Sequence, residues 1–250
     1  MDRRTKAVCW ENSMNQTTVS SGDPRGSLPQ IIVNWEGLYE GNLVKYFQAL
    51  FYTAENLNLP YHNFRHCTHV FYLCYEASRF YKDELSKRRI RNLLIAAKFH
   101  DFNHTGVAGD DALNIERSVA ALRQHLDECD RDSLEDIVLL LQGSQYPYIL
   151  GDDKLPLEGL ILRDADLMQA FSTAWIQQVV FGLAAEWGKT PIEVLALQQK
   201  FLGNIVFKTE WGRLLVPKAA IALKINEAQA LLDILTMPTS PLETREALEV

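Results

Sequence analysis

Apolar residues recur along this chain at the spacing of amphipathic helices, and the strict alternation that is typical of half-buried strands is scarce. Residues three and four apart fall on one face of a helix, so each repeating group predicts one buried stripe. The clearest groups are Leu43, Phe47 and Leu50; Val70, Leu73, Cys74 and Ala77; and Leu93, Leu94, Ala97 and Lys98. The pattern predicts an all-α fold.

Glycine and proline interrupt this helical pattern and predict where helices end. The predicted breaks are Leu59-Pro60, Gly106 to Gly109, Gly143 to Gly151, Gly188 to Pro191, and the neighbourhood of Gly212 and Pro217. They imply about eight helices of ordinary globular length. One helix start is specified in detail, because Thr190 suits the N-cap, Pro191 the first turn and Glu193 the third position of a capping box.

The first part of the chain differs in composition from the rest. Residues 12–30 are rich in Ser, Thr, Asn, Gly and Pro and have little to bury, which predicts a flexible tail over residues 1–30. Order is expected to begin near Ile31. A chain of 250 residues with 47% hydrophobic content can bury one good core, and no repeat divides it, so residues 31–250 are predicted to form one domain.

Charge and cysteine content narrow the class of protein. The formal net charge of -7 argues against a general binder of nucleic acid or of anionic membranes, and leaves a small molecule as the expected partner. Cys9, Cys67, Cys74 and Cys129 show no zinc-finger spacing, so we expect reduced thiols. The start of the chain is polar and no apolar run reaches about 18 residues, which predicts a cytoplasmic protein. Nothing in the sequence specifies an oligomeric state.

Histidine and aspartate recur in an ordered series. His62 and His66 lie one helical turn apart, the pair His100-Asp101 ends an apolar run, and Asp164-Ala165-Asp166 follows another apolar stretch. A single histidine on an apolar helix is usually a hydrogen-bonded core residue. Five of the six histidines, however, fall within 43 positions, and imidazole with carboxylate is a donor set that divalent metals prefer. The series therefore favours a metal site.

The motifs Tyr-His-Asn-x-x-His from Tyr61, His-Asp-x-x-His-x-Gly from His100 and Ala-Asp-Leu from Ala165 resemble, in this order, the HD superfamily of metal-dependent phosphohydrolases. They are most similar to the catalytic domain of class I cyclic-nucleotide phosphodiesterases. A fourth block, Gln198 to Val206, is similar to the segment that lines the purine pocket of that family. The resemblance implies a helical HD-type domain that hydrolyses a 3′,5′-cyclic purine nucleotide (cAMP or cGMP) to the 5′-monophosphate.

The resemblance also implies a binuclear metal centre. His66, His100, Asp101 and Asp166 match the ligands of the first ion, and Asp101 would bridge to a second ion that is otherwise largely hydrated. Two divalent ions, drawn from Zn, Mg, Mn or Fe, are therefore expected as cofactors. Asp164 is an alternative to Asp166, because the two carboxylates flank a single alanine, although the Ala-Asp-Leu match favours Asp166.

Three further residues acquire catalytic roles from the resemblance. His62 matches the proton donor to the leaving ribose oxygen. His104 matches a histidine that hydrogen-bonds a metal-bound water, and its alternative is a cap at the end of a helix. Glu116 lies in a segment similar to one in smaller bacterial HD hydrolases, where an acidic residue lies close to the metals. Its alternative is a solvated position on a helix.

The substrate pocket is expected to include the fourth block. The amide of Gln198 can donate and accept, so it can pair with a purine edge, while Phe201 one turn away can stack on the ring. Val179 or Leu183 would form the opposite wall, and Tyr61 is assigned to the same pocket. Taken alone, a Gln-x-x-Phe pair is more often a surface residue beside a core residue.

The chain also departs from the family pattern. His69 stands where the phosphodiesterases usually have Asp, Gly109 stands near their Asn, and their Glu-Asn-His-His element is not recognisable. These differences leave the metal centre intact and the substrate open. One alternative is an HD phosphohydrolase that acts on a non-cyclic nucleotide or another nucleotide second messenger. Another is a ligand-binding regulator without turnover, against which the presence of His62 argues.

Overall fold

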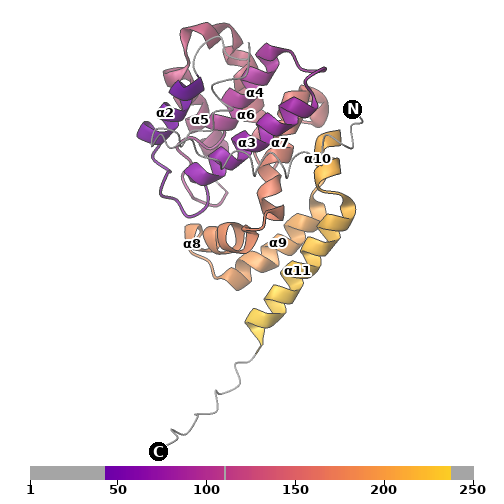
Figure 1. The fold of residues 1–250 in the computed structure, drawn as a ribbon. Helices are drawn as coiled ribbons and strands as arrows, with labels where there is room; N and C mark the ends of the chain where they lie inside the picture. Colours follow the sequence, from indigo (N-terminus) through magenta and orange to yellow (C-terminus); the bar gives the residue numbers. More distant parts are fainter. Residues whose placement is uncertain (1–42, 110, 238–250) are drawn as a thin grey trace, which may run out of the picture.

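The computed structural model describes residues 43–109 and 111–237, and these residues form helices and no strand, which confirms the predicted all-α fold (Figure 1). The predicted tail, residues 1–30, and the predicted start of the domain near Ile31 lie outside the described residues. The α-helices are α2 (Leu43–Thr53), α3 (Phe64–Phe80), α4 (Lys87–Phe99), α5 (Asp111–His125), α6 (Leu134–Ser144), α7 (Leu157–Leu167), α8 (Gly182–Glu186), α9 (Pro191–Asn204), α10 (Glu210–Leu215) and α11 (Lys218–Thr236). The 3-10 helices are η2 (Glu128–Ser133), η3 (Asp152–Lys154) and η4 (Met168–Phe171), and η5 (Ile176–Phe181) is a π-helix.

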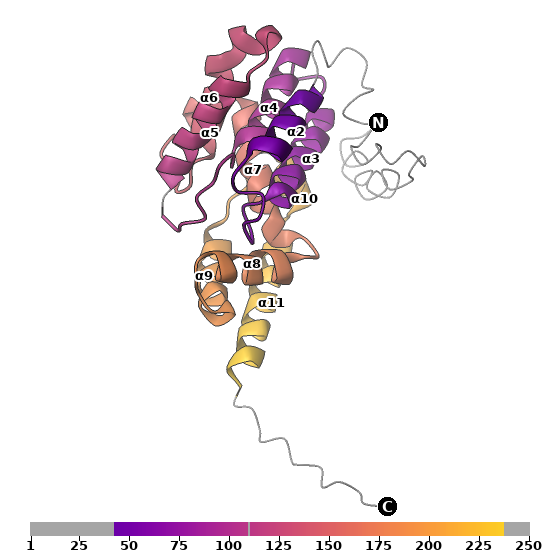
Figure 2. The ribbon, with the colours of Figure 1, turned by 90° about the vertical axis from the view of Figure 1, so that its left-hand side faces the viewer.

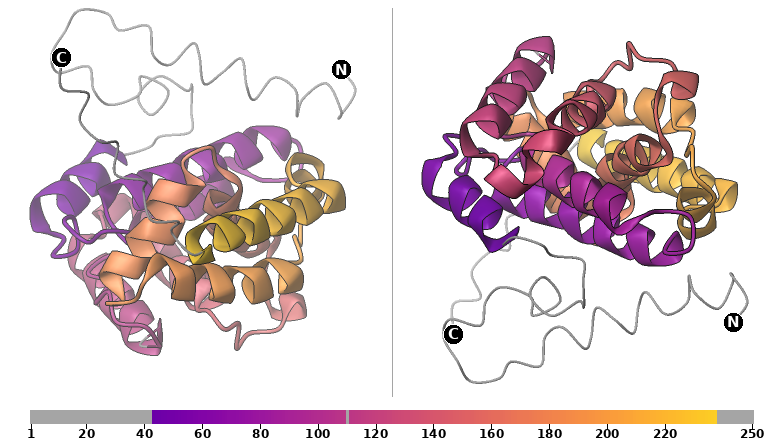
Figure 3. Two further views of the ribbon diagram at one scale, coloured as in Figure 1. Left: turned by 90° about the horizontal axis from the view of Figure 1, so that it is seen from below. Right: turned by 90° about the horizontal axis from the view of Figure 1, so that it is seen from above.

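The helices form two groups with separate apolar cores (Figure 2). Helices α2 to α7 and α10 enclose the larger core, in which α4 packs against α2, α3, α5, α6 and α7. The smaller core is formed by η5, α8, α9 and α11, and α9 and α11 lie side by side (Figure 3). Residues between α7 and α8 connect the two groups, so a site at this junction can draw side chains from both.

The predicted apolar stripes are buried. All members of the three groups are nearly inaccessible. Cys67 is buried beside them, and neither its thiol nor that of Cys74 forms a disulfide in the described part of the chain. Lys98 is also buried, and its Nζ lies 3.7 Å from the ring centroid of Phe71. Burial lowers the pKa of Lys98 well below its ordinary value. No helix in the described ranges is both long and apolar enough to cross a bilayer.

Most of the predicted breaks separate helices. Gly106 and Gly188 lie in loops at positive φ, and Thr190 with Glu193 forms the predicted capping box at the start of α9. The break predicted near Gly212 and Pro217 lies at Val216 and Pro217, between α10 and α11, whereas Gly212 itself lies inside α10. A Cβ there would collide with the carboxylate of Asp164, so this glycine permits close packing instead of a turn. Because of short helices such as α8 and α10, the described residues contain more helices than the eight or so expected from the sequence.

A buried ion network fixes α2 and η2 to the first half of α4. The carboxylate of Asp130 is fully buried and accepts hydrogen bonds from Tyr46 Oη (2.6 Å), Arg91 Nε (2.7 Å) and Arg91 Nη2 (2.7 Å). Arg88 Nη1 donates a further bond of 2.6 Å. Burial acts to raise the pKa of Asp130, but the bonds from Arg91 and Tyr46 outweigh it and the pKa is lowered. This network therefore holds α4, the helix whose C-cap residue is His100.

Candidate active site

Four of the side chains that the sequence predicted as metal ligands meet at the junction of α3, α4 and α7. His66 Nε2 lies 3.1 Å from Asp101 Oδ2 and 3.1 Å from Asp166 Oδ1. His100 Nε2 lies 3.2 Å from Asp101 Oδ2 and 3.2 Å from His66 Nε2. Asn63 caps the start of α3, and the end of α4 places His100 and Asp101 opposite it. Helix packing therefore gathers donors that are separated by 100 residues in the chain.

The hydrogen bonds behind the two imidazoles determine what they present to this cluster. His66 Nδ1 donates to Gln169 Oε1, and His100 Nδ1 donates to the carbonyl of Ala97 (3.0 Å). With hydrogen on Nδ1, each neutral ring directs the Nε2 lone pair toward the carboxylates. Asp101 Oδ2 is buried beside the Nε2 atoms of His66 and His100, and it accepts no hydrogen bond from these rings in their neutral form. Lone pairs from two imidazoles and two carboxylates thus converge, and this donor set fits a divalent cation.

Electrostatics support the same interpretation. Burial alone would lower the pKa of His66, but hydrogen bonds with Asp101 and Asp166 raise it well above its ordinary value. Burial would likewise raise the pKa of Asp101, whereas the neighbouring His100 and His66 lower it strongly. A proton on His66 and a metal ion would compete for the same position, because both neutralise the same carboxylates.

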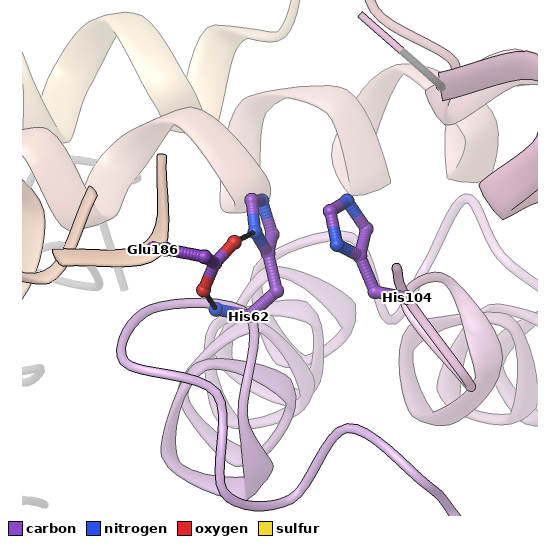
Figure 4. Close-up of side chains that lie close together, drawn as sticks. All are labelled: His62, His104 and Glu186. Atoms are coloured by element: carbon purple, nitrogen blue, oxygen red, sulfur yellow. Dashed lines mark hydrogen bonds and ion pairs between the residues drawn. The ribbon is translucent and has the colours of Figure 1, made fainter. Parts of the chain in front are cut away.

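His62, His104 and Glu186 form a second group (Figure 4), and the ring centroid of His62 lies 5.8 Å from that of His66 in the first cluster. Glu186 comes from α8 and accepts bonds from the backbone N–H groups of Tyr61 (2.8 Å) and His62 (3.0 Å). His62 Nδ1 donates to the other carboxylate oxygen of Glu186, which leaves Nε2 free for other contacts. Burial would raise the pKa of Glu186, but the hydrogen bond from His62 lowers it, so the carboxylate stays charged beside the imidazole.

His104 supports His62 from the other side. Its ring stacks on the ring of His62, with centroids 3.6 Å apart and planes 19° apart. Its Nδ1 accepts from the N–H of Gly106 (3.0 Å), and its Nε2 contacts the amide of Asn114 (2.9 Å). Burial, followed by the charge of His62, lowers the pKa of His104 to about 4. Both ring nitrogens thus contact the protein, and the predicted contact with a metal-bound water remains a prediction.

The two neighbouring aspartates of α7 have different environments. Asp166 faces His66, whereas Asp164 is buried elsewhere. Asp164 accepts bonds from the backbone N–H groups of Lys208 (2.8 Å) and Thr209 (2.8 Å) and from the hydroxyl of Thr209 (2.6 Å). It therefore anchors the start of α10, and its placement does not support the alternative in which it binds the metal.

A cavity of about 540 Å³ opens next to both groups of side chains. The residues that line this cavity and that the sequence assigned to the site are Tyr61, His62, His100, Asp101, His104, Asp166, Val179, Leu183, Gln198 and Phe201. Gln198 is 5% exposed, and its Oε1 finds no hydrogen-bond partner among the described residues. Phe201 lies at the rim, where the ring of Tyr146 meets it edge to face with centroids 6.0 Å apart. The cavity thus joins the acceptor cluster to an amide oxygen that lacks a hydrogen-bond partner in the part of the chain that the structure describes.

Glu116 does not join this site. It is exposed on α5 and does not line the cavity, whereas Asn114 and Ile115 of the same helix do. The helical phase explains the difference, because residues two positions apart on a helix point to nearly opposite sides. The exposed side chain of Glu116 agrees with the alternative interpretation, a solvated position on a helix.

The structure adds polar residues that the sequence did not predict. Gln169 contacts His66, Glu186 contacts His62, and Asp111 lines the cavity. Burial, together with the charges of Asp101 and Asp166, raises the pKa of Asp111, and the hydrogen bond from the backbone N–H of Tyr146 opposes this only in part. Asp111 and Gln169 stand near predicted motifs, but Gln169 and Glu186 contact histidines more than 100 residues away, and such contacts leave no local signal.

Comparison with known proteins gives one match. Residues 61–135 match the family model of 3′5′-cyclic nucleotide phosphodiesterase, which confirms the resemblance predicted from the motifs. The match includes His62, His66, His100, Asp101 and His104, while Asp166 and Gln198 lie beyond it. No curated protein and no solved structure matches the chain. The family is one of metal-dependent hydrolases with small nucleotide substrates, and the His and Asp cluster agrees with this class.

Proposed function

We propose that this protein is a metal-dependent phosphodiesterase that hydrolyses a 3′,5′-cyclic purine nucleotide, cAMP or cGMP, to the 5′-monophosphate. One observation carries the proposal. His100, Asp101 and Asp166, which converge with His66, line the same cavity as the buried amide of Gln198, whose Oε1 has no hydrogen-bond partner among the described residues. A phosphodiester bound at the His and Asp cluster would direct its base toward Gln198.

In this proposal His66, His100, Asp101 and Asp166 would hold two divalent ions, expected to be Zn, Mg, Mn or Fe, and Asp101 would serve both. When bound, such ions would supply an acidified water and neutralise the negative charge that develops on the phosphate. The carboxylates contribute the negative charge that retains such cations, and the buried imidazoles exclude bulk water from one side of them.

His62 acts as the general acid. Hydrolysis adds the oxygen of water to phosphorus and breaks the bond from phosphorus to the ribose 3′ oxygen, which needs a proton as it leaves. His62 lines the cavity, and its Nδ1 is held by Glu186, so Nε2 is the nitrogen that delivers this proton. The charged Glu186 stabilises the protonated imidazole before transfer. His104 keeps the ring of His62 in place by stacking.

The base lies between Phe201 and the apolar wall formed by Val179 and Leu183. The carboxamide of Gln198 pairs with the polar edge of the purine, which supplies the hydrogen-bond partner that its Oε1 lacks within the described protein. Tyr61 lines the same cavity close to the phosphate side. A non-cyclic nucleotide is the competing substrate class, and the experiment below separates the two.

Turnover of a panel of cyclic and linear nucleotides by metal-reconstituted protein tests the substrate. Gln198→Ala should lower kcat/KM for the preferred cyclic purine nucleotide about tenfold to a hundredfold, or roughly 1–3 kcal/mol, because base and pocket groups stay unpaired. Hydrolysis of bis(p-nitrophenyl) phosphate, which has no base, should hardly change. Gln199→Ala is the matched control, since that amide contacts Gln229 on α11.

Two results would contradict this proposal. If Gln198→Ala slows both substrates equally, the amide does not recognise the base. If the wild-type protein cleaves linear nucleotides alone, the cyclic substrate is wrong and the competing class takes its place.

A further inference from the structure

Gln169 connects the metal cluster to the π-helix η5. It lies in η4, three residues after Asp166, and is 2% exposed. Its Oε1 accepts from His66 Nδ1, and its Nε2 donates to Gln178 Oε1 of η5 (2.5 Å). Both ends of one buried amide are thereby engaged, one by a predicted metal ligand and the other by a second glutamine.

The direction of this amide decides which nitrogen of His66 carries hydrogen. A carbonyl oxygen can only accept, so Gln169 Oε1 requires hydrogen on His66 Nδ1 and leaves the Nε2 lone pair facing Asp101 and Asp166. If the amide were reversed, its NH₂ group would face Nδ1 and favour hydrogen on Nε2. That hydrogen would occupy the position where a cation is expected.

Gln178 opposes such a reversal. Its Oε1 faces the Nε2 of Gln169, and rotation of the Gln169 amide alone would bring two carbonyl oxygens together. Gln178 is supplied by a π-helix, a wider turn that occurs frequently at functional sites. Both glutamines also line a small polar cavity.

We propose that Gln169 is a positioning residue for the candidate metal site, with Gln178 as its orienting partner. Gln169 fixes the ring and the tautomer of His66, which presents Nε2 to the ion and makes this nitrogen a better donor. Residues that hold metal-binding histidines in this way typically contribute tenfold to a hundredfold in metal affinity. The inference rests on the proposed metal site and concerns how the ring orientation and the tautomer of one ligand, His66, are fixed.

The affinity for Zn²⁺, measured by competition with a chromophoric chelator, tests this role without any turnover assay. Gln169→Met keeps the size of the side chain but removes the acceptor, and should weaken Zn²⁺ binding about tenfold to a hundredfold. Gln169→Glu keeps an acceptor and should bind Zn²⁺ at least as tightly as the wild type. Gln178→Met should fall between wild type and Gln169→Met, and Gln177→Met, at an exposed position of the same π-helix, should have no effect.

A space-filling role predicts another order of affinities. In that case the buried charge of Gln169→Glu would be the more disruptive change, and Gln169→Met would bind Zn²⁺ like the wild type. Either that order or an equal loss in both variants overturns the positioning role while the metal site stands. If the wild-type protein binds no metal, the proposed function and this inference both fail.

Discussion

Replacement of Asp130 by alanine should destabilise the fold by about 3–5 kcal/mol, the usual cost of removing one member of a buried ion pair. The magnitude comes mainly from Arg91, which is 2% exposed and loses both of its hydrogen bonds to the carboxylate. Arg88 contributes little, because its side chain is 41% exposed and can turn to solvent. Domains are stable by about 5–15 kcal/mol, so the variant loses a large share of its stability.

Urea unfolding followed by circular dichroism measures this loss. With a slope of about 2 kcal/mol per molar urea, the midpoint should fall by roughly 1.5–2.5 M while the slope stays unchanged. Glu135→Ala is the control, because Glu135 pairs with Arg123 at the surface, where such a pair contributes less than about 1 kcal/mol. If Asp130→Ala costs no more than this control, the buried network does not hold α4 in place and the reasoning is refuted.

Four further variants probe the site and its surroundings. Glu186→Gln should lower turnover about tenfold to a hundredfold with unchanged metal content, since it removes the charge beside His62; loss of metal would contradict this assignment. His62→Ala should lose on the order of 10²–10⁴ in turnover and keep its metal, whereas His66→Ala should lose both turnover and metal. An equal loss of metal in the two variants would contradict the assignment of His62 as acid and His66 as ligand. Burial lowers the pKa of His69 to about 4. As the pH falls, His69 therefore takes up a proton in the unfolded chain before it does so in the folded one. The stability that is present above pH about 6.5 should then be lost as the pH falls toward about 4. His69→Gln should flatten this loss in urea titrations at pH 7 and 4.5 by at most about 3 kcal/mol, and identical pH dependence in both proteins would argue against it.

The parts of the fold that follow from local chemistry were predictable from the sequence. The capping box at Thr190 and Glu193 depends on residues three apart, and the stripe of α3 depends on a periodic pattern within one helix. Gly212 was misinterpreted because its reason is a packing contact with Asp164, 48 residues earlier in the chain. A glycine that allows close approach and a glycine that allows a turn look alike in a sequence.

The candidate site shows the same division. Motifs pointed to His66, His100 and Asp101, which lie within one short part of the chain, and the structure brings them together with Asp166; their metal-binding roles stay predictions. Glu186 was not predicted, because its contact with His62 spans 124 positions and depends on how α8 packs below the main bundle. Such orienting contacts are set by tertiary structure and leave no periodic trace.

The most direct test of the account is the metal content of the protein together with its turnover of cAMP and cGMP, compared between wild type and Asp101→Ala. Asp101 contacts both histidines and contributes a buried carboxylate oxygen with no other partner among the described residues. Elemental analysis should find metal in the wild type, with formation of the 5′-monophosphate, and the variant should lose the second ion and its activity. Two ions per chain with normal turnover in Asp101→Ala would contradict the account.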